Sequence, residues 1–127
     1  MTGVEPRFLL DTNICIYLLA ARDDQLRKRV EACDEGELVT STIVYAEVMI
    51  GANRRGGSNA ALALFDRIPP LAFDLGAGSA YADLPFNRGN FDRLIAAHAV
   101  SLGLALVTNN ERDFADIDGL KVENWVR

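Results

Sequence analysis

The stretch Phe8-Leu9-Leu10-Asp11-Thr12-Asn13 is a short apolar run that stops abruptly at a carboxylate and two small polar residues. Its length and its polar end predict a buried strand of a parallel sheet. In open α/β sheets, ligands bind just beyond the carboxyl ends of the strands. Asp11 is therefore expected where chemistry takes place, although a cap for the following helix is an equally good interpretation of this residue alone.

The composition is that of an ordinary globular chain, which we expect to form one domain over residues 1–127. Half of the residues are apolar, and no apolar run approaches the roughly 20 residues that cross a bilayer. The N-terminus lacks the pattern of a secretory signal, and two cysteines, Cys15 and Cys33, do not make a disulfide framework. We therefore expect a cytoplasmic protein with reduced cysteines and no membrane contact.

The net charge of −5 argues mildly against nucleic acid as a partner, because phosphate binding usually leaves a basic footprint on the protein. This objection weakens if several acids are gathered to hold cations, since a bound divalent ion reverses the local field. The placement of the acids therefore matters more than their number.

Strands and helices alternate along the rest of the chain. We expect helices at 14–20, 25–33, 43–52, 59–67, 77–84 and 91–102, and further strands at 38–40, 71–73, 104–108 and 121–125. We expect a loop from Asn53 to Ser58. We expect the last strand at the edge of the sheet. Right-handed crossovers between such elements predict an α/β domain with a mainly parallel sheet of four to five short strands.

Two acids fall on apolar faces of predicted helices. Their apolar neighbours at helical spacing are Ile43, Ala46 and Ile50 for Glu47, and Ile95, Ala96 and Ala99 for Asp92. A carboxylate on such a face is costly unless it is paired or binds a metal. A salt bridge of Glu47 and a helix-dipole role of Asp92 are the simpler alternatives. His98, the only histidine, points away from Asp92 and is interpreted as a packing residue.

These patterns allow four carboxylates to converge on one pocket. The two best strands end at Asp11 and Thr108, and parallel strands bring such ends to one edge of the sheet. Glu47, Asp92 and Asp113 can then reach that edge. Without cations their pKa values would have to rise, and an all-oxygen ligand set suits Mg²⁺ or Mn²⁺ rather than zinc. Such a site predicts phosphodiester hydrolysis by a metal-activated water.

The chain resembles the PIN-domain toxins of the VapC family over essentially its whole length. The segments that carry the resemblance are Leu9–Asn13, the helix with Glu47, Phe91–Ala99, Val107–Asn110 with Asp113-Phe114, and Gly119–Trp125. The resemblance implies a three-layer α/β/α PIN-like fold and a metal-dependent endoribonuclease, the toxin of a type II toxin–antitoxin system. It also implies a VapB-type antitoxin that inhibits the enzyme, a homodimer, and a toxin–antitoxin hetero-oligomer.

Roles follow from the resemblance position by position. Asp11 and Asp92 match the acids that hold Mg²⁺ most directly, and Glu47 matches a third acid that binds the metal or positions water. Many PIN domains carry an aspartate where this chain has Asn110, so either Asn110 or the catalytic candidate Asp113 completes the site. Further residues match supporting polar positions: Thr12, Thr108 and Asn110. We assign the cap of the first helix to Thr12.

Five arginines near the predicted edge are candidates for RNA contact, although the better interpretation of each one alone is a solvated or salt-bridged side chain: Arg54, Arg55, Arg88, Arg93 and Arg112. In a dimer, the arginines of the two subunits could line one groove and locally offset the net negative charge. The alternative function is a catalytically inactive PIN-like protein-binding module, which would not need the four acids. An aspartyl-phosphate enzyme is disfavoured, because Asn13 replaces the second aspartate that a dehalogenase-type phosphatase has.

Overall fold

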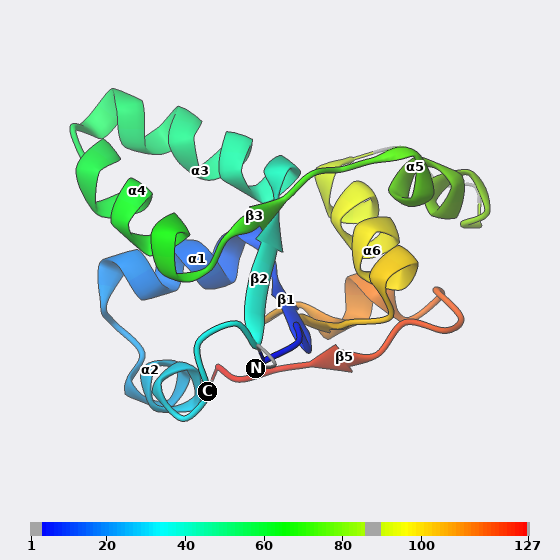
Figure 1. Cartoon of the computed structure of the whole chain (residues 1–127), viewed down its shortest axis with the longest axis horizontal. Coiled ribbons are helices and arrows are strands. Elements are labelled where there is room, and N and C mark those ends of the chain that lie inside the picture. Colours follow the sequence, from blue (N-terminus) through cyan, green and yellow to red (C-terminus); the bar gives the residue numbers. More distant parts are fainter. Residues whose placement is uncertain (1–3, 86–89, 127) are drawn as a thin grey trace.

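A parallel sheet of five strands forms the centre of the computed structural model, which describes residues 4–85 and 90–126 (Figure 1). The strands are β1 (Phe8–Leu10), β2 (Leu38–Ser41), β3 (Pro70–Leu71), β4 (Ala105–Val107) and β5 (Val122–Glu123). Their order is β3-β2-β1-β4-β5, and every neighbouring pair is parallel. The predicted parallel sheet is confirmed, and β5 lies at its edge as expected.

Helices cover both faces of this sheet. They are α1 (Thr12–Ala20), α2 (Asp24–Glu31), α3 (Thr42–Arg55), α4 (Ser58–Arg67), α5 (Leu75–Ala82), α6 (Phe91–Leu102) and the 3-10 helix η1 (Glu111–Phe114). Figure 1 shows α1, α2 and α4 on one side of the central strands and α5 and α6 on the other, which confirms the three-layer α/β/α fold. The chain steps outward from β1 to β3 and then crosses to β4. The carboxyl ends of β1 and β4 therefore form the kind of switch point at which α/β proteins bind ligands.

The central strands are buried on both faces, as their apolar runs predict. Leu9, Leu10, Leu106 and Val107 are fully buried, which fits a parallel sheet that lies between two helical layers. Trp125, two residues after β5, is buried in the core and forms an edge-to-face contact with Phe8 at a centroid distance of 4.9 Å. Among the described residues, none of the helices has the length and apolar character that crossing a membrane requires. Both cysteines are free thiols, in line with the prediction.

His98 packs inside the protein, as predicted. It is buried, its ring meets that of Phe73 edge-on at 5.5 Å, and Nδ1 lies 2.8 Å from the Ser41 hydroxyl. The Ser41 oxygen also accepts the Ile43 N–H as the N-cap of α3, so its own hydrogen is free to bond Nδ1. Burial lowers the pKa of His98. A neutral histidine therefore links α6 to the junction of β2 and α3.

Several element boundaries differ from the prediction by one to three residues, and two of these differences have a local cause. The segment expected as a loop from Asn53 instead continues α3 to Arg55, and the helix ends at Gly56, which has φ +81°. A glycine adopts this left-handed conformation without strain and so sets the end of the helix. The expected strand at 71–73 is shifted to Pro70–Leu71, because Asp74 accepts the Ala77 N–H and caps α5.

The orientation of α3 also corrects the sequence interpretation. Its buried residues are Val44 and Val48, whereas Ala46 and Ile50 are exposed. Of the row predicted to face the core, Ala46 and Ile50 thus point outward and Ile43 is only partly buried, because the β-branched pair at i and i+4 is the one that packs in the core. Glu47 lies at the border of the two faces and is half-buried. Its cost of burial is smaller than the predicted inward position implies.

Candidate active site

Asp11 lies at the switch point, directly after β1. Its backbone N–H donates to Val107 O of β4 at 3.1 Å, which joins the two strand ends. The side chain is only 5% exposed, and Oδ1 accepts the Ile14 N–H at 3.0 Å. Asp11 is therefore the N-cap of α1. The assignment of this cap to Thr12 is wrong, because the aspartate oxygen reaches the free N–H group of the first turn.

The electrostatics of Asp11 show which groups surround it. Burial raises the pKa of its carboxyl to about 6, and hydrogen bonds from the Thr108 hydroxyl and the Ile14 N–H oppose this rise. The carboxylates of Asp92 and Glu47 raise the pKa of Asp11 further. Such an effect requires proximity, since charge–charge interactions weaken with distance. Asp92 and Glu47 thus both lie within electrostatic reach of Asp11.

Glu47 and Thr12 are joined directly. Thr12 Oγ1 donates to Glu47 Oε1 at 2.6 Å, and this bond links the start of α1 to the middle of α3 across 35 positions of sequence. A hydrogen bond to an ionised oxygen is among the stronger ones in proteins. Thr12 therefore fixes the orientation of the Glu47 carboxylate at the edge where Asp11 lies.

Asp92 occupies the first turn of α6. The helix is capped by Asn90, whose Oδ1 accepts the Arg93 N–H at 3.0 Å. Burial raises the pKa of Asp92, and the carboxylate of Asp113 raises it further. Asp92 and Asp113 both line a hollow of about 430 Å³ between α6 and η1. Asp92 therefore interacts electrostatically with both Asp113 and Asp11, which places the three acids in one site.

A series of polar contacts leads from the buried acid to the exposed one. The Thr108 hydroxyl lies close enough to the Asp11 carboxylate to lower its pKa, and it accepts the Asn110 N–H at 3.1 Å. The side-chain amide of Asn110 donates to Asp113 Oδ2. Asn110 and Asp113 therefore do not occupy alternative positions. Asn110 holds the Asp113 carboxylate, and both lie at the end of β4.

Sequence reasoning missed Asn109, between these two residues. Its amide nitrogen donates to the Tyr17 hydroxyl at 3.0 Å, so it ties the end of β4 to α1. Its carbonyl oxygen is buried and has no hydrogen-bond partner among the residues that the structure describes. The run Thr108-Asn109-Asn110 after a strand was the available signal, because side-chain amides at such an edge usually bond to something.

The predicted RNA-binding arginines differ in how exposed their side chains are. Arg93 is 4% exposed and forms an ion pair with Asp116, so its prediction as an RNA contact is wrong. Arg112 is exposed on η1 next to Asp113. Arg54 and Arg55 are exposed in the last turn of α3, at one end of a groove of about 560 Å³ between α1, α3 and α4. The fifth candidate, Arg88, lies outside the described residues.

The acids fit a magnesium site in the chemistry of their donors, which are all oxygen. In residues 4–85 and 90–126, however, no group of three or more Asp, Glu, His or Cys side chains is close enough to hold one metal ion directly. Mg²⁺ usually keeps several waters and takes only one or two carboxylates.

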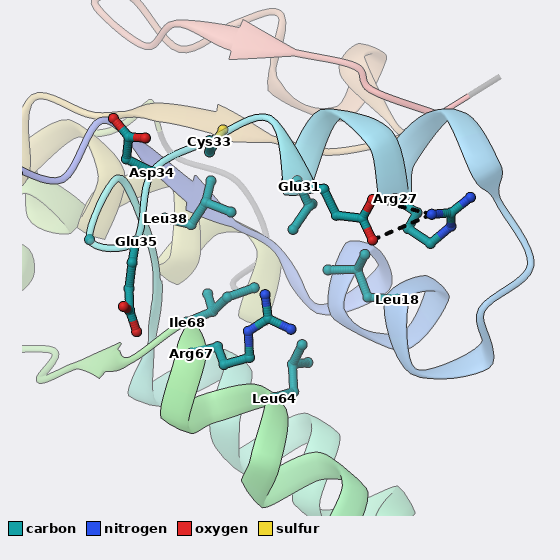
Figure 2. Close-up of a pocket in the computed structure, with 12 residues that line it drawn as sticks. Leu18, Arg27, Glu31, Cys33, Asp34, Glu35, Leu38, Leu64, Arg67 and Ile68 are labelled. Atoms are coloured by element: carbon teal, nitrogen blue, oxygen red, sulfur yellow. Dashed lines mark hydrogen bonds and ion pairs between the residues drawn. The ribbon is translucent and has the colours of Figure 1, made fainter.

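A second hollow, of about 400 Å³, lies away from these acids (Figure 2). Leu38, the first residue of β2, lines it, which places it at the opposite edge of the sheet from Asp11. Figure 2 shows Leu64 and Arg67 of α4 across from Leu18 and from the Arg27–Glu31 ion pair. None of the predicted acids lines this hollow, so it is not part of the candidate active site.

Comparison with known proteins agrees with this fold. The PIN domain family matches residues 8–120. The chain is 35% identical to the tRNA(fMet)-specific endonuclease VapC of Shigella flexneri, over 94% of this chain and 98% of that protein. It is 31% identical to the ribonuclease VapC2 of Rickettsia felis, over 93% and 97%.

Solved structures give the same result. A chain in the crystal structure of VapBC2 from Rickettsia felis, bound to a DNA fragment from their promoter, has a TM-score of 0.82 at 29% identity, over 93% of this chain and 98% of that one. For VapBC-1 from nontypeable Haemophilus influenzae the TM-score is 0.80 at 32% identity, over 93% and 97%. The chain belongs to the VapC family of PIN-domain proteins.

Proposed function

We propose that this protein is a magnesium-dependent endoribonuclease that hydrolyses RNA phosphodiester bonds. The observation that carries the proposal is the environment of Asp11, a buried acid whose pKa is raised by burial and by two neighbouring carboxylates. Such a cluster is costly in a protein that uses it only for packing, whereas a divalent cation reverses the local field. The names of the VapC relatives, which are ribonucleases and endonucleases, support the same activity.

Asp11 and Asp92 would hold the ion, with Glu47 and Asp113 bonded to its water shell. When bound, Mg²⁺, or Mn²⁺ in its place, would neutralise charge at the scissile phosphate and make a water molecule more acidic. Thr108 keeps the Asp11 carboxylate in place. Glu47, oriented by Thr12, positions the attacking water and accepts its proton.

The RNA backbone would be bound by arginines at the rim of the site. Arg112 lies beside Asp113, and Arg54 and Arg55 lie at the end of the groove that begins near Glu47. These side chains are exposed and can neutralise phosphates despite the acidic total. We propose a homodimer, in which two such rims contribute to one RNA-binding surface.

We further propose that the protein is the toxin of a type II pair and is inhibited by a VapB-type antitoxin in a hetero-oligomer. The solved VapBC structures support this partner, because the chains that resemble this one were found in complexes of that kind. A small open reading frame next to the gene, encoding a DNA-binding protein that co-purifies with this chain, is the expected finding. The alternative of an inactive binding module does not account for the acids at the switch point.

The test is cleavage of total RNA and of initiator tRNA by the purified protein, with Mg²⁺ or with EDTA. We expect cut products with Mg²⁺ only, and none from Asp92→Asn, because this variant loses a direct metal ligand. Asp66→Asn, which removes an exposed acid on α4, is the matched control and should cleave normally. Cleavage by folded Asp92→Asn at the parent rate would rule out the proposed site.

A further inference from the structure

Arg93 directly follows Asp92, and its guanidinium is held inside the protein. Nη1 and Nη2 donate to the two carboxylate oxygens of Asp116 at 2.9 and 3.1 Å, and Nη2 also lies 3.4 Å from Pro85 O. This two-bond geometry is the strongest arrangement of an arginine with a carboxylate. Arg93 is also the only buried lysine or arginine in residues 4–85 and 90–126.

The position of Arg93 in its helix is electrostatically unfavourable by itself. It lies in the first turn of α6, where the helix dipole favours negative rather than positive charge. A buried positive charge there requires a specific partner, and Asp116 supplies it from 23 positions away. The contact is thus a tertiary one that the local sequence does not explain.

The ion pair joins the two segments that carry candidate acids. Arg93 is next to Asp92 on α6, and Asp116 lies just beyond η1, which carries Asp113. Arg93, Asp116 and both acids line the same hollow. Asp92 and Asp113 have like charges and repel each other, so some attraction must hold α6 and η1 together before a cation binds.

We propose that Arg93 is a positioning residue of the candidate active site. Its ion pair with Asp116 holds η1 against the first turn of α6 and thereby sets the separation of Asp113 from Asp92. The contact with Pro85 O adds the residues that directly follow α5 to the same support. The effect of Arg93 on RNA cleavage rests on the proposed nuclease function, whereas its effect on the placement of η1 does not.

The test compares Arg93→Met, Asp116→Asn, the double variant and Arg93→Lys with the parent. We expect each single variant to weaken Mn²⁺ binding about tenfold, as is usual when a residue that supports metal ligands is lost. Free Mn²⁺ is measured by electron paramagnetic resonance. Hydrogen–deuterium exchange should become faster in residues 111–117 and remain unchanged in α2.

Three further results separate positioning from a general loss of stability. With folded protein and the RNA concentration varied up to saturation, kcat should fall while KM for RNA stays constant, because Arg93 is buried and does not reach the RNA. The double variant should be no worse than Arg93→Met, since the two residues act through one interaction. Arg93→Lys should restore part of the Mn²⁺ affinity, because lysine keeps the charge without the two-bond fork.

Arg27→Met and Glu31→Gln are the matched controls, since they remove an exposed ion pair on α2. If Arg93→Met does not fold, Asp116→Asn carries the same test, because the Asp116 side chain is 50% exposed. Parent-like Mn²⁺ affinity and exchange in the folded variants would overturn the proposal. A parent that binds Mn²⁺ without cutting RNA would refute only the nuclease function. A parent that binds no Mn²⁺ would refute the metal site, and exchange in residues 111–117 would then decide whether Arg93 positions η1.

Discussion

Asp11 shows how one side chain can combine a structural role with a candidate chemical one. Its Oδ1 accepts the Ile14 N–H and caps α1, while the same carboxylate is buried beside Asp92 and Glu47. The sequence presented capping and catalysis as alternatives. In the folded chain they are compatible, because a carboxylate has several acceptor positions and the N–H groups of a helix start also favour negative charge.

The raised pKa of Asp11 predicts how metal-free stability changes with pH. The unfolded carboxyl titrates near its model value of 3.8, and the folded one at about 6. Because the folded pKa is the higher one, folding favours the protonated form. The contribution to stability is therefore full below pH 3.8 and is lost as the pH rises through 6. The total loss is about 3 kcal/mol, of which about 2 kcal/mol falls between about pH 4.5 and 7.5.

Asp11→Asn should remove this dependence, since asparagine does not ionise and still caps α1. In EDTA, the free energy of unfolding of the variant should gain about 2 kcal/mol on the parent between about pH 4.5 and 7.5. Urea unfolding followed by circular dichroism gives both values. A constant difference between the two proteins across this range would mean that the Asp11 pKa is not raised.

Thr12→Val should separate the orientation of Glu47 from the fold. The valine keeps the shape but lacks the hydroxyl that donates to Glu47 Oε1. We expect RNA cleavage to fall about tenfold to a hundredfold, as for other residues that orient metal-site carboxylates, with little change in melting temperature. Thr12→Ser restores a hydroxyl and should recover most of the rate. Equal rates for all three proteins would contradict this role.

At the scale of single elements, α3 shows the limit of periodicity. The pattern correctly predicted a helix that begins after Ser41, because the cap and the apolar content are local features. It predicted the wrong inner face, because both rows of α3 contain apolar residues. Only the packing of the helix on the sheet decided that Val44 and Val48 face inward.

Two alanine substitutions on α3 test this orientation. Val48 is 4% exposed, so Val48→Ala should reduce the free energy of unfolding by about 2 kcal/mol through lost burial and a cavity. Ile50 is 55% exposed, and Ile50→Ala should change it by less than about 0.5 kcal/mol. The comparison uses urea unfolding at one pH. A larger loss for Ile50→Ala than for Val48→Ala would restore the face predicted from the sequence.

At the scale of the whole molecule, the sheet order explains why distant acids meet. Asp11 follows β1 and Asp113 follows β4. Glu47 lies within α3 and Asp92 in the first turn of α6, and both helices pack at the same edge of the sheet. Parallel neighbours β1 and β4 end side by side, so residues about 100 positions apart become neighbours. The candidate site is thus a property of the topology, to which each element contributes one carboxylate.

Divalent metal should stabilise this molecule as a whole. Binding only to the folded chain raises the free energy of unfolding, by about 2.7 kcal/mol at a metal concentration 100 times Kd. We therefore expect a higher melting temperature in Mg²⁺ or Mn²⁺ than in EDTA at about pH 7.5. The increase should be absent in Asp11→Asn and retained in the exposed-acid control Asp66→Asn. The same melting temperature with and without metal would argue against a metal site.

The sequence by itself determined the order of the elements, the parallel sheet and the strand ends that carry Asp11 and Thr108. These features depend on apolar runs, caps and turn residues that act within a few positions. Only the tertiary structure decided the bond from Thr12 to Glu47, the ion pair of Arg93 with Asp116 and the inner face of α3. Each of these joins residues far apart in the chain, and their partners are chosen by how helices and strand ends pack together.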